Sequence, residues 1–113
     1  MNQLTELEKS TAHIIVEIIE YAPNSVVSKT IINKTTGNIN VVSFDAGEGL
    51  GEKIIPYDTF VQIIDGKAEV VIDGKSHLLD TGQSIIIPAH TSNIVKANER
   101  FKMISTIIKS GYD

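Results

Sequence analysis

The residues of this chain that can exchange a proton near neutral pH are three histidines, His13, His77 and His90. A positioned imidazole can act as a general acid or base, or can bind a metal ion. None of the three has a second histidine or an acidic residue at the spacing of a metal or catalytic motif. The chain has no cysteine, which excludes disulfides, thiolate metal sites and a cysteine nucleophile. His90 is the best candidate for proton transfer, because it follows Pro88 at a turn into a strand; a surface histidine in a loop is the simpler interpretation.

A lysine in an apolar setting, Lys53, is the second candidate for chemistry. It precedes Ile54 and Ile55, and an ammonium buried without a partner is costly. Lys53 must therefore pair with a carboxylate, reach water or bind an anionic ligand. The acidic residues close to it in sequence are Glu48, Glu52 and Asp58. An ion pair with one of them, or a reach to water, is favoured over ligand binding.

Two further polar candidates, Tyr57 and Gln62, follow in the same region. Tyr57 comes directly after Pro56, where its ring could shield a pocket or only form part of a turn between strands. Gln62 interrupts an apolar run, and a buried amide needs hydrogen-bond partners. An inward Gln62 would either bond within the interior or mark a polar ligand pocket.

The elements that must position these residues are β-strands. The chain has 19 Ile and 9 Val against 5 Leu, and β-branched side chains favour strands over helices. Asp65-Gly66 and Asp73-Gly74 are typical of two-residue hairpin turns, which need positive φ. Short strands without intervening helices predict an all-β fold, an antiparallel sandwich or closed barrel. The predicted strands are Val26–Ile32, Asn38–Phe44, Phe60–Ile64, Lys67–Ile72, Lys75–Leu79, Ser84–Ile87, Asn93–Lys96 and Arg100–Lys109.

The first 24 residues are less regular, and they are expected to form an N-terminal extension before one barrel domain at 25–113. Thr5 and Glu8 have the spacing of a capping box, which predicts a short helix over Thr5–Lys9. The run Ile14–Tyr21 fits either a helical turn or a strand. Further along, the sequence GEGLG at 47–51 could cradle a phosphate, but it lacks the following helix and the Lys-Ser/Thr of a P-loop. A glycine-rich turn at a barrel corner is favoured.

Two segments have a fixed spacing that begins at a glycine. The first runs from Gly47 to Gly66 and the second from Gly82 to Ala97, and their fixed intervening positions are Lys53, Ile55, Thr59, Pro88, His90 and Asn93. These spacings resemble the two motifs of the cupin superfamily, G-x5-H-x-H-x3-E-x6-G and G-x5-P-x-G-x2-H-x3-N. The phrases GEGLGE, PYDTFVQIIDGKAEVVIDG, IIIPA and RFKMISTIIKS are similar to those of small, single-domain bacterial cupins. The resemblance implies a single-domain antiparallel β-barrel or jelly roll, which a short N-terminal helical turn would precede.

In cupins that bind a metal, two histidines and a glutamate of the first motif and a histidine of the second are the ligands. The resemblance places these ligands on Lys53, Ile55, Thr59 and Asn93, and the glycine of the second motif on His90. A cation, an aliphatic side chain and two neutral oxygens do not make a transition-metal site. We therefore predict neither a metal ion nor another cofactor.

The leading functional hypothesis is a non-catalytic small cupin, in which no residue is assigned a catalytic role. Its lumen would bind a small polar or anionic molecule, or the barrel would have only a structural or regulatory role. The candidate lining residues of the lumen are Lys53, Ile55, Tyr57, Thr59, Gln62, His90 and Asn93. A second hypothesis is a metal-independent sugar epimerase or isomerase that uses His90, Lys53 and Tyr57 as acids and bases. A third, which the sequence favours least, is a metal-dependent cupin enzyme with relocated ligands.

Bulk properties narrow the choice of partners and compartment. The chain has 113 residues, the size of one domain, and a formal charge of −4 with scattered cations, which argues against nucleic acid. Its apolar runs are too short to span a bilayer, so a soluble, cytoplasmic protein without membrane contact is expected. A homodimer is predicted, because a barrel rich in Ile and Val exposes apolar strand faces. The candidate contacts are Ile14–Ile19 and the face of Ile104, Thr106 and Ile108.

Overall fold

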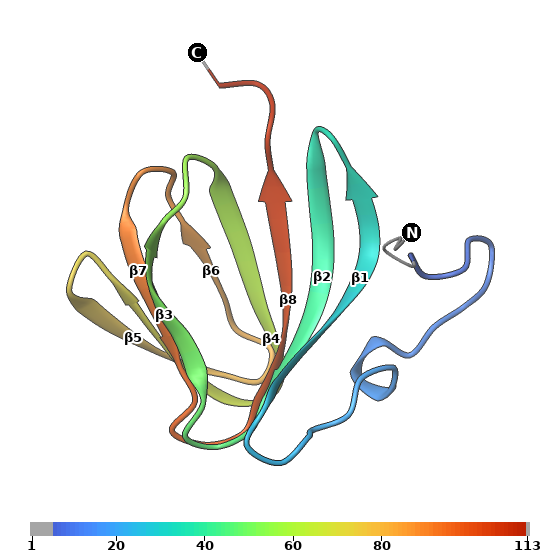
Figure 1. Ribbon diagram of the computed structural model, residues 1–113, viewed down its shortest axis with the longest axis horizontal. Coiled ribbons are helices and arrows are strands. Elements are labelled where there is room, and N and C mark those ends of the chain that lie inside the picture. Colours follow the sequence, from blue (N-terminus) through green and yellow to red (C-terminus); the bar gives the residue numbers. More distant parts are fainter. Residues whose placement is uncertain (1–5, 113) are drawn as a thin grey trace.

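The computed structural model describes residues 6–112, which form eight strands and one short 3-10 turn (Figure 1). The strands are β1 (Val26–Lys34), β2 (Gly37–Phe44), β3 (Gly49–Ile54), β4 (Asp58–Ile72), β5 (Lys75–Asp80), β6 (Ser84–Ile87), β7 (Ser92–Lys96) and β8 (Phe101–Ile108). All the pairings between them are antiparallel. The predicted all-β class is thereby confirmed.

Strand β4 is the centre of the molecule, because it pairs with four other strands. Its first half lies between β8 and β6, and β8 continues through β2 to β1. Its second half lies between β7 and β5, and β7 continues to β3. Figure 1 shows the resulting curl, with β3, β5 and β7 on one side and β1, β2 and β8 on the other. Two curled sheets that share one long strand give the predicted jelly roll its shape.

The passage of β4 from one sheet to the other occurs at Asp65-Gly66, where the sequence predicted a hairpin turn. That prediction is wrong: 58–72 is one continuous strand with a register shift between Ile63 and Asp65. Gly66 has a φ of +85°, and a Cβ at this position would lie 2.2 Å from the carbonyl oxygen of Arg100. Positive φ suits a bulge as well as a turn, so the Asp-Gly pair alone does not distinguish the two.

Most other strand predictions agree with the structure. Asp73 and Gly74 have φ values of 47° and 81°, as a tight two-residue hairpin between β4 and β5 requires. The predicted strands for β1, β2, β5, β6, β7 and β8 match the observed ones to within two residues at each end. Strand β3 was missed, because Gly49 and Gly51 suggested a longer turn; the turn is confined to the residues around Gly47, whose φ is +88°.

The core lies between the two sheets and follows the alternation of the strands. Phe44 and Phe101 stack with ring centroids 4.4 Å apart, and both are fully buried. Val61 and Ile63 of β4 are buried, whereas Phe60 and Gln62, which alternate with them, are exposed. The inward face of the barrel is therefore the face of the odd-numbered residues in the first half of β4.

The N-terminal segment covers part of the outer face of β2 and β8. It contains the 3-10 turn Ile15–Glu17, so the helical turn is confirmed and the strand alternative is wrong. Ile19 is 2% exposed, and Ser43 Oγ donates to the carbonyl of Glu20 at 2.8 Å. The predicted helix at Thr5–Lys9 is wrong for residues 6–9, which are not helical; Thr5 lies outside the described residues.

Tyr21 fixes the end of this segment to the bend of β4. Its hydroxyl donates to Asp65 Oδ2 at 2.5 Å, and the cations of Arg100 and Lys102 lie 4.4 and 4.9 Å from its ring centroid. Burial and the hydrogen bond to the Asp65 carboxylate raise the pKa of Tyr21 well above its usual range. The segment is thus held by polar and cation–π contacts as well as by Ile19. Within residues 6–112, no helix has the length and apolar character needed to cross a bilayer.

Candidate functional site

A cavity of about 50 Å³ lies in the lumen between the two sheets. It takes side chains from five strands, β3, β4, β6, β7 and β8, and from the β3–β4 loop. Most of its wall is aliphatic, and its polar residues are few. The lining residues are Leu50, Lys53, Ile55, Thr59, Val61, Ile87, Asn93, Val95, Met103, Ser105 and Ile107.

The register of the strands brings the motif positions together. Lys53 of β3 lies directly opposite Asn93 of β7, so their side chains share one face of the sheet. Thr59, at the start of β4, lies between Ile87 of β6 and Ile107 of β8. The four positions at which the resemblance places the cupin metal ligands, Lys53, Ile55, Thr59 and Asn93, therefore line one cavity, although 40 residues separate the first from the last.

Two buried oxygens in this cavity have no hydrogen-bond partner among residues 6–112. They are Thr59 Oγ1 and Asn93 Oδ1, and the residues that carry them are 5% and 1% exposed. The other end of the Asn93 amide is engaged, since Nδ2 donates to the carbonyl of Lys53 at 3.4 Å. Most buried polar groups in proteins are paired, and a pair of unpaired ones in one cavity marks a place for a ligand or water.

Lys53 is half-buried at the same cavity, and burial lowers the pKa of its ammonium. Among residues 6–112 no carboxylate lies within ion-pairing distance of it. The neighbouring acids have other partners: Glu52 accepts a hydrogen bond from Ser92 Oγ at 2.5 Å, and Asp58 accepts one from the Ala89 amide at 2.9 Å. Of the two alternatives that the sequence favoured, the internal ion pair is therefore not formed, whereas the partial exposure of Lys53 agrees with a reach to water.

Three of the predicted lining residues lie outside the cavity. Gln62 is exposed on the outer face, opposite Ser84 of β6, so its predicted inward orientation is wrong. His90 is exposed in the β6–β7 turn with a φ of 66°, and its amide donates to the Ile55 carbonyl at 2.8 Å. Tyr57 lies in the β3–β4 loop, where its ring centroid is 6.0 Å from that of Tyr112.

One polar lining residue, Ser105 of β8, was not proposed for the site from the sequence. The sequence feature that could have identified Ser105 is the alternation of the last strand, which places Met103, Ser105 and Ile107 on the same face. Met103 is 3% exposed, and all three line the cavity. A polar residue on the apolar face of a strand is the pattern that would have identified it.

The cavity does not fit the divalent metal that the fold family commonly binds. Its donors are one ammonium and the neutral oxygens of Thr59, Asn93 and Ser105, whereas transition metals favour imidazole and carboxylate. Across residues 6–112 there is also no group of three or more His, Asp and Glu side chains that could hold an ion.

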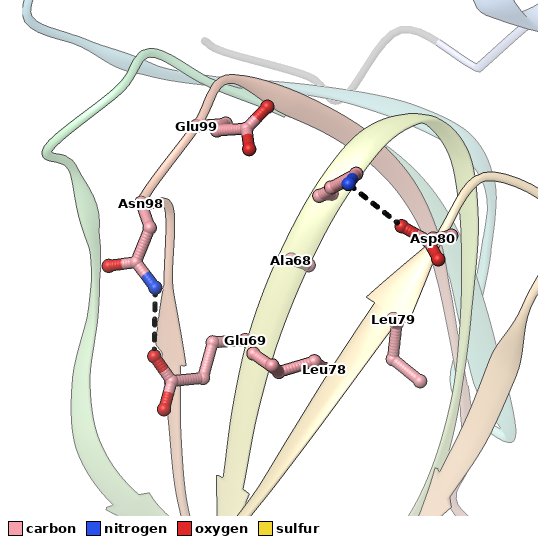
Figure 2. A pocket seen from close by; sticks show the side chains of 8 residues that line it. Ala68, Glu69, Leu78, Leu79, Asp80, Asn98 and Glu99 are labelled. Carbon is pink, nitrogen blue, oxygen red and sulfur yellow. Dashed lines mark hydrogen bonds and ion pairs between the residues drawn. The ribbon is translucent and has the colours of Figure 1, made fainter.

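A larger depression of about 370 Å³ lies at β4, β5 and the β7–β8 loop (Figure 2). Four of its polar side chains, Lys67, Glu69, Asp80 and Asn98, are already paired with one another. Glu69 accepts hydrogen bonds from Asn98 Nδ2 at 2.9 Å and Ser76 Oγ at 2.6 Å, which lower the pKa of its carboxyl. Lys67 and Asp80 form an exposed ion pair at 3.8 Å. The lumen, with its unpaired groups, is therefore the better candidate site.

Solved structures similar to this chain exist, whereas comparison with protein-family models and with curated protein sequences finds no match. A conserved protein of unknown function from Streptococcus pyogenes superimposes with a TM-score of 0.89 at 26% identity, over 99% of this chain and 98% of that one.

Two solved cupins are also similar. A cupin superfamily protein from Desulfitobacterium hafniense matches with a TM-score of 0.87 at 25% identity, over 96% of this chain and all of that one. A cupin 2 conserved barrel domain protein from Leptotrichia buccalis matches with a TM-score of 0.80 at 32% identity, over 83% of this chain and 46% of that one. The spacing of the motifs, the meeting of the four motif positions in one cavity and these superpositions all agree. The chain therefore belongs to the cupin superfamily.

Proposed function

We propose that this chain is a non-catalytic cupin whose lumen binds a small anionic or polar molecule. The observation that carries the proposal is the state of Lys53, a half-buried ammonium that has no ion-pair partner among residues 6–112. A buried charge without a partner is costly, and an anionic ligand would supply the missing charge. Such a ligand would also accept a hydrogen bond from the unpaired hydroxyl of Thr59.

The distribution of polar groups favours binding over acid–base chemistry. An enzyme of the epimerase type would need His90, Tyr57 and Lys53 around one substrate, but neither His90 nor Tyr57 lines the cavity. The lining contains no histidine and no carboxylate, which are the most frequent general acids and bases. The remaining lining groups can hold a ligand by charge and hydrogen bonds.

The proposal is tested by titrating the protein with sodium formate and sodium acetate in a calorimeter, using the wild type, Lys53→Met and Lys67→Met. Lys67 is the matched control, because it is an exposed lysine outside the cavity. Loss of a hydrogen bond to a charged group costs about 1.5 to 3 kcal/mol, so Lys53→Met should weaken binding roughly ten- to a hundredfold. Lys67→Met should leave the affinity unchanged. Absence of binding in the wild type, or equal affinities in all three proteins, would reject the proposal.

A further inference from the structure

The size of the lumen cavity limits what it can hold. Its volume is about 50 Å³, and a buried water needs roughly 10 to 15 Å³ of such space. The cavity therefore has room for a ligand of roughly three to five non-hydrogen atoms. Sugars and nucleotides are too large, whereas the smallest carboxylates and planar oxyanions are of the right size.

The polar groups of the cavity also require a particular pattern of donors and acceptors. The Lys53 ammonium can only donate, the Thr59 and Ser105 hydroxyls can donate or accept, and the Asn93 carbonyl oxygen can only accept. The orientation of the Asn93 amide is set by its surroundings, because Nδ2 must face the Lys53 carbonyl, which is itself an acceptor. Asn93 Oδ1 is thereby left as a buried acceptor without a donor.

An anion without hydrogen-bond donors would satisfy only part of this arrangement. It could accept from Lys53 and Thr59, but it would leave Asn93 Oδ1 unpaired in a site without room for many waters. A buried acceptor that stays unpaired keeps its full desolvation penalty. A ligand that carries both an anionic oxygen and a hydroxyl would satisfy Lys53 and Asn93 together.

We propose that the lumen selects a small oxyanion that also carries a hydroxyl group, of which hydrogen carbonate is the simplest example. The anionic oxygens accept from Lys53 and Thr59, and the hydroxyl donates to Asn93 Oδ1. Binding involves no covalent step. This inference rests on the proposed function, because it assumes that an anion binds beside Lys53, and it adds the chemical class that the site prefers.

The test compares hydrogen carbonate with nitrate, a planar monoanion of similar size that has no hydroxyl. The full chain is titrated with each sodium salt at mildly alkaline pH and constant ionic strength, and binding is followed by isothermal titration calorimetry, which serves the wild type and the variants alike. One additional hydrogen bond in a buried site corresponds to roughly a tenfold difference in affinity. Hydrogen carbonate should therefore bind about ten times more tightly than nitrate.

The variant Asn93→Leu separates the hydroxyl preference from anion binding. It removes the acceptor and keeps a branched side chain with the same number of non-hydrogen atoms, so the preference for hydrogen carbonate over nitrate should disappear. A second ligand pair, glycolate and acetate, repeats the comparison on the wild type and does not depend on whether the variant folds. The expected result is tighter binding of glycolate.

The outcomes distinguish this inference from the proposed function. Equal binding of the two members in both ligand pairs would overturn the hydroxyl preference and leave anion binding intact. A preference for hydrogen carbonate that persists in Asn93→Leu would overturn the role assigned to Asn93. Failure of all four anions to bind the wild type would overturn the proposed function and the inference together.

Discussion

Lys53 brings a charge into a largely aliphatic lumen, and burial lowers the pKa of its ammonium below that of an exposed lysine. The unfolded chain should keep this proton up to about pH 10.4, the usual lysine value. Between the lowered pKa and that value the unfolded state binds more protons than the folded state, so Lys53 makes stability rise with pH in this window. At neutral pH the buried charge is destabilising.

We therefore expect Lys53→Met to raise the free energy of unfolding at neutral pH in the absence of ligand. The advantage of the variant should shrink as the pH rises toward about 10.4, because the wild type then folds with a neutral amine. Urea unfolding at several pH values measures the difference. Lys67→Met, which removes an exposed charge, should give a curve parallel to the wild type. A constant advantage of Lys53→Met over the whole pH range would contradict the expectation.

The candidate site was predictable from the sequence where it depended on the spacing of the motifs. Lys53, Ile55, Thr59 and Asn93 were expected to face one lumen, and they line one cavity. Gln62 was misplaced for a reason that strand geometry explains. Thr59 and Gln62 are three residues apart in one regular stretch of β4, so their side chains must point to opposite faces. The unpaired oxygens of Thr59 and Asn93, and the absence of an ion pair at Lys53 among residues 6–112, depend on atomic contacts, which the spacing of residues in the sequence does not reveal.

The elements were predictable wherever apolar alternation defined a strand, and the errors concentrate at glycines. Gly66 was assigned to a turn and Gly49–Gly51 to a loop, although both lie in strands. A glycine shows that the backbone can adopt a positive φ or approach another chain segment closely, but the surrounding fold decides which of these it does. At Gly66 both apply, since φ is +85° and the Arg100 carbonyl lies against it.

The bend of β4 should therefore be the position most sensitive to an added methyl group. Gly66→Ala introduces backbone strain, which costs about 1 to 3 kcal/mol, and a contact with main-chain atoms that cannot easily move. Gly82→Ala is the matched control, because its φ is +92° and nothing lies within 4 Å of its Cβ position. Thermal unfolding should show a larger loss of stability for Gly66→Ala. Equal losses would mean that the close approach at Arg100 has no energetic effect.

At the scale of the whole molecule, the outer face of the larger sheet carries an apolar row. Cross-strand pairing aligns Ile86 of β6, Phe60 of β4, Thr106 of β8, Ile39 of β2 and Ile32 of β1. Ile86, Phe60 and Ile32 are 61%, 39% and 40% exposed. The row extends the face of Ile104, Thr106 and Ile108 that the sequence proposed as a dimer contact. Part of the other proposed contact is used internally, since Ile19 packs within its own chain.

We expect two copies of the chain to pair through this row, because contiguous exposed apolar surface favours self-association. Ile86→Arg should then convert a dimer into a monomer in sedimentation velocity at micromolar concentration. Leu78→Arg is the control, since Leu78 is 74% exposed but belongs to β5 on the other sheet. A monomeric wild type, or dissociation by the Leu78 substitution and not by the Ile86 one, would show that this face is not the interface.

The sharing of β4 between the two sheets has a consequence for how the protein gains and loses its structure. A sandwich with separate sheets could in principle lose one layer while the other persists. Here the pairing of β8 with β6 through one half of β4, and of β7 with β5 through the other, depends on the same backbone. Each of the two sheets therefore contains part of β4, and neither can form completely without it. This shared strand couples the folding of the two sheets into one cooperative event. Because β7 and β8 are distant in sequence from the parts of β4 with which they pair, that event carries a large loop-closure entropy and favours slow folding.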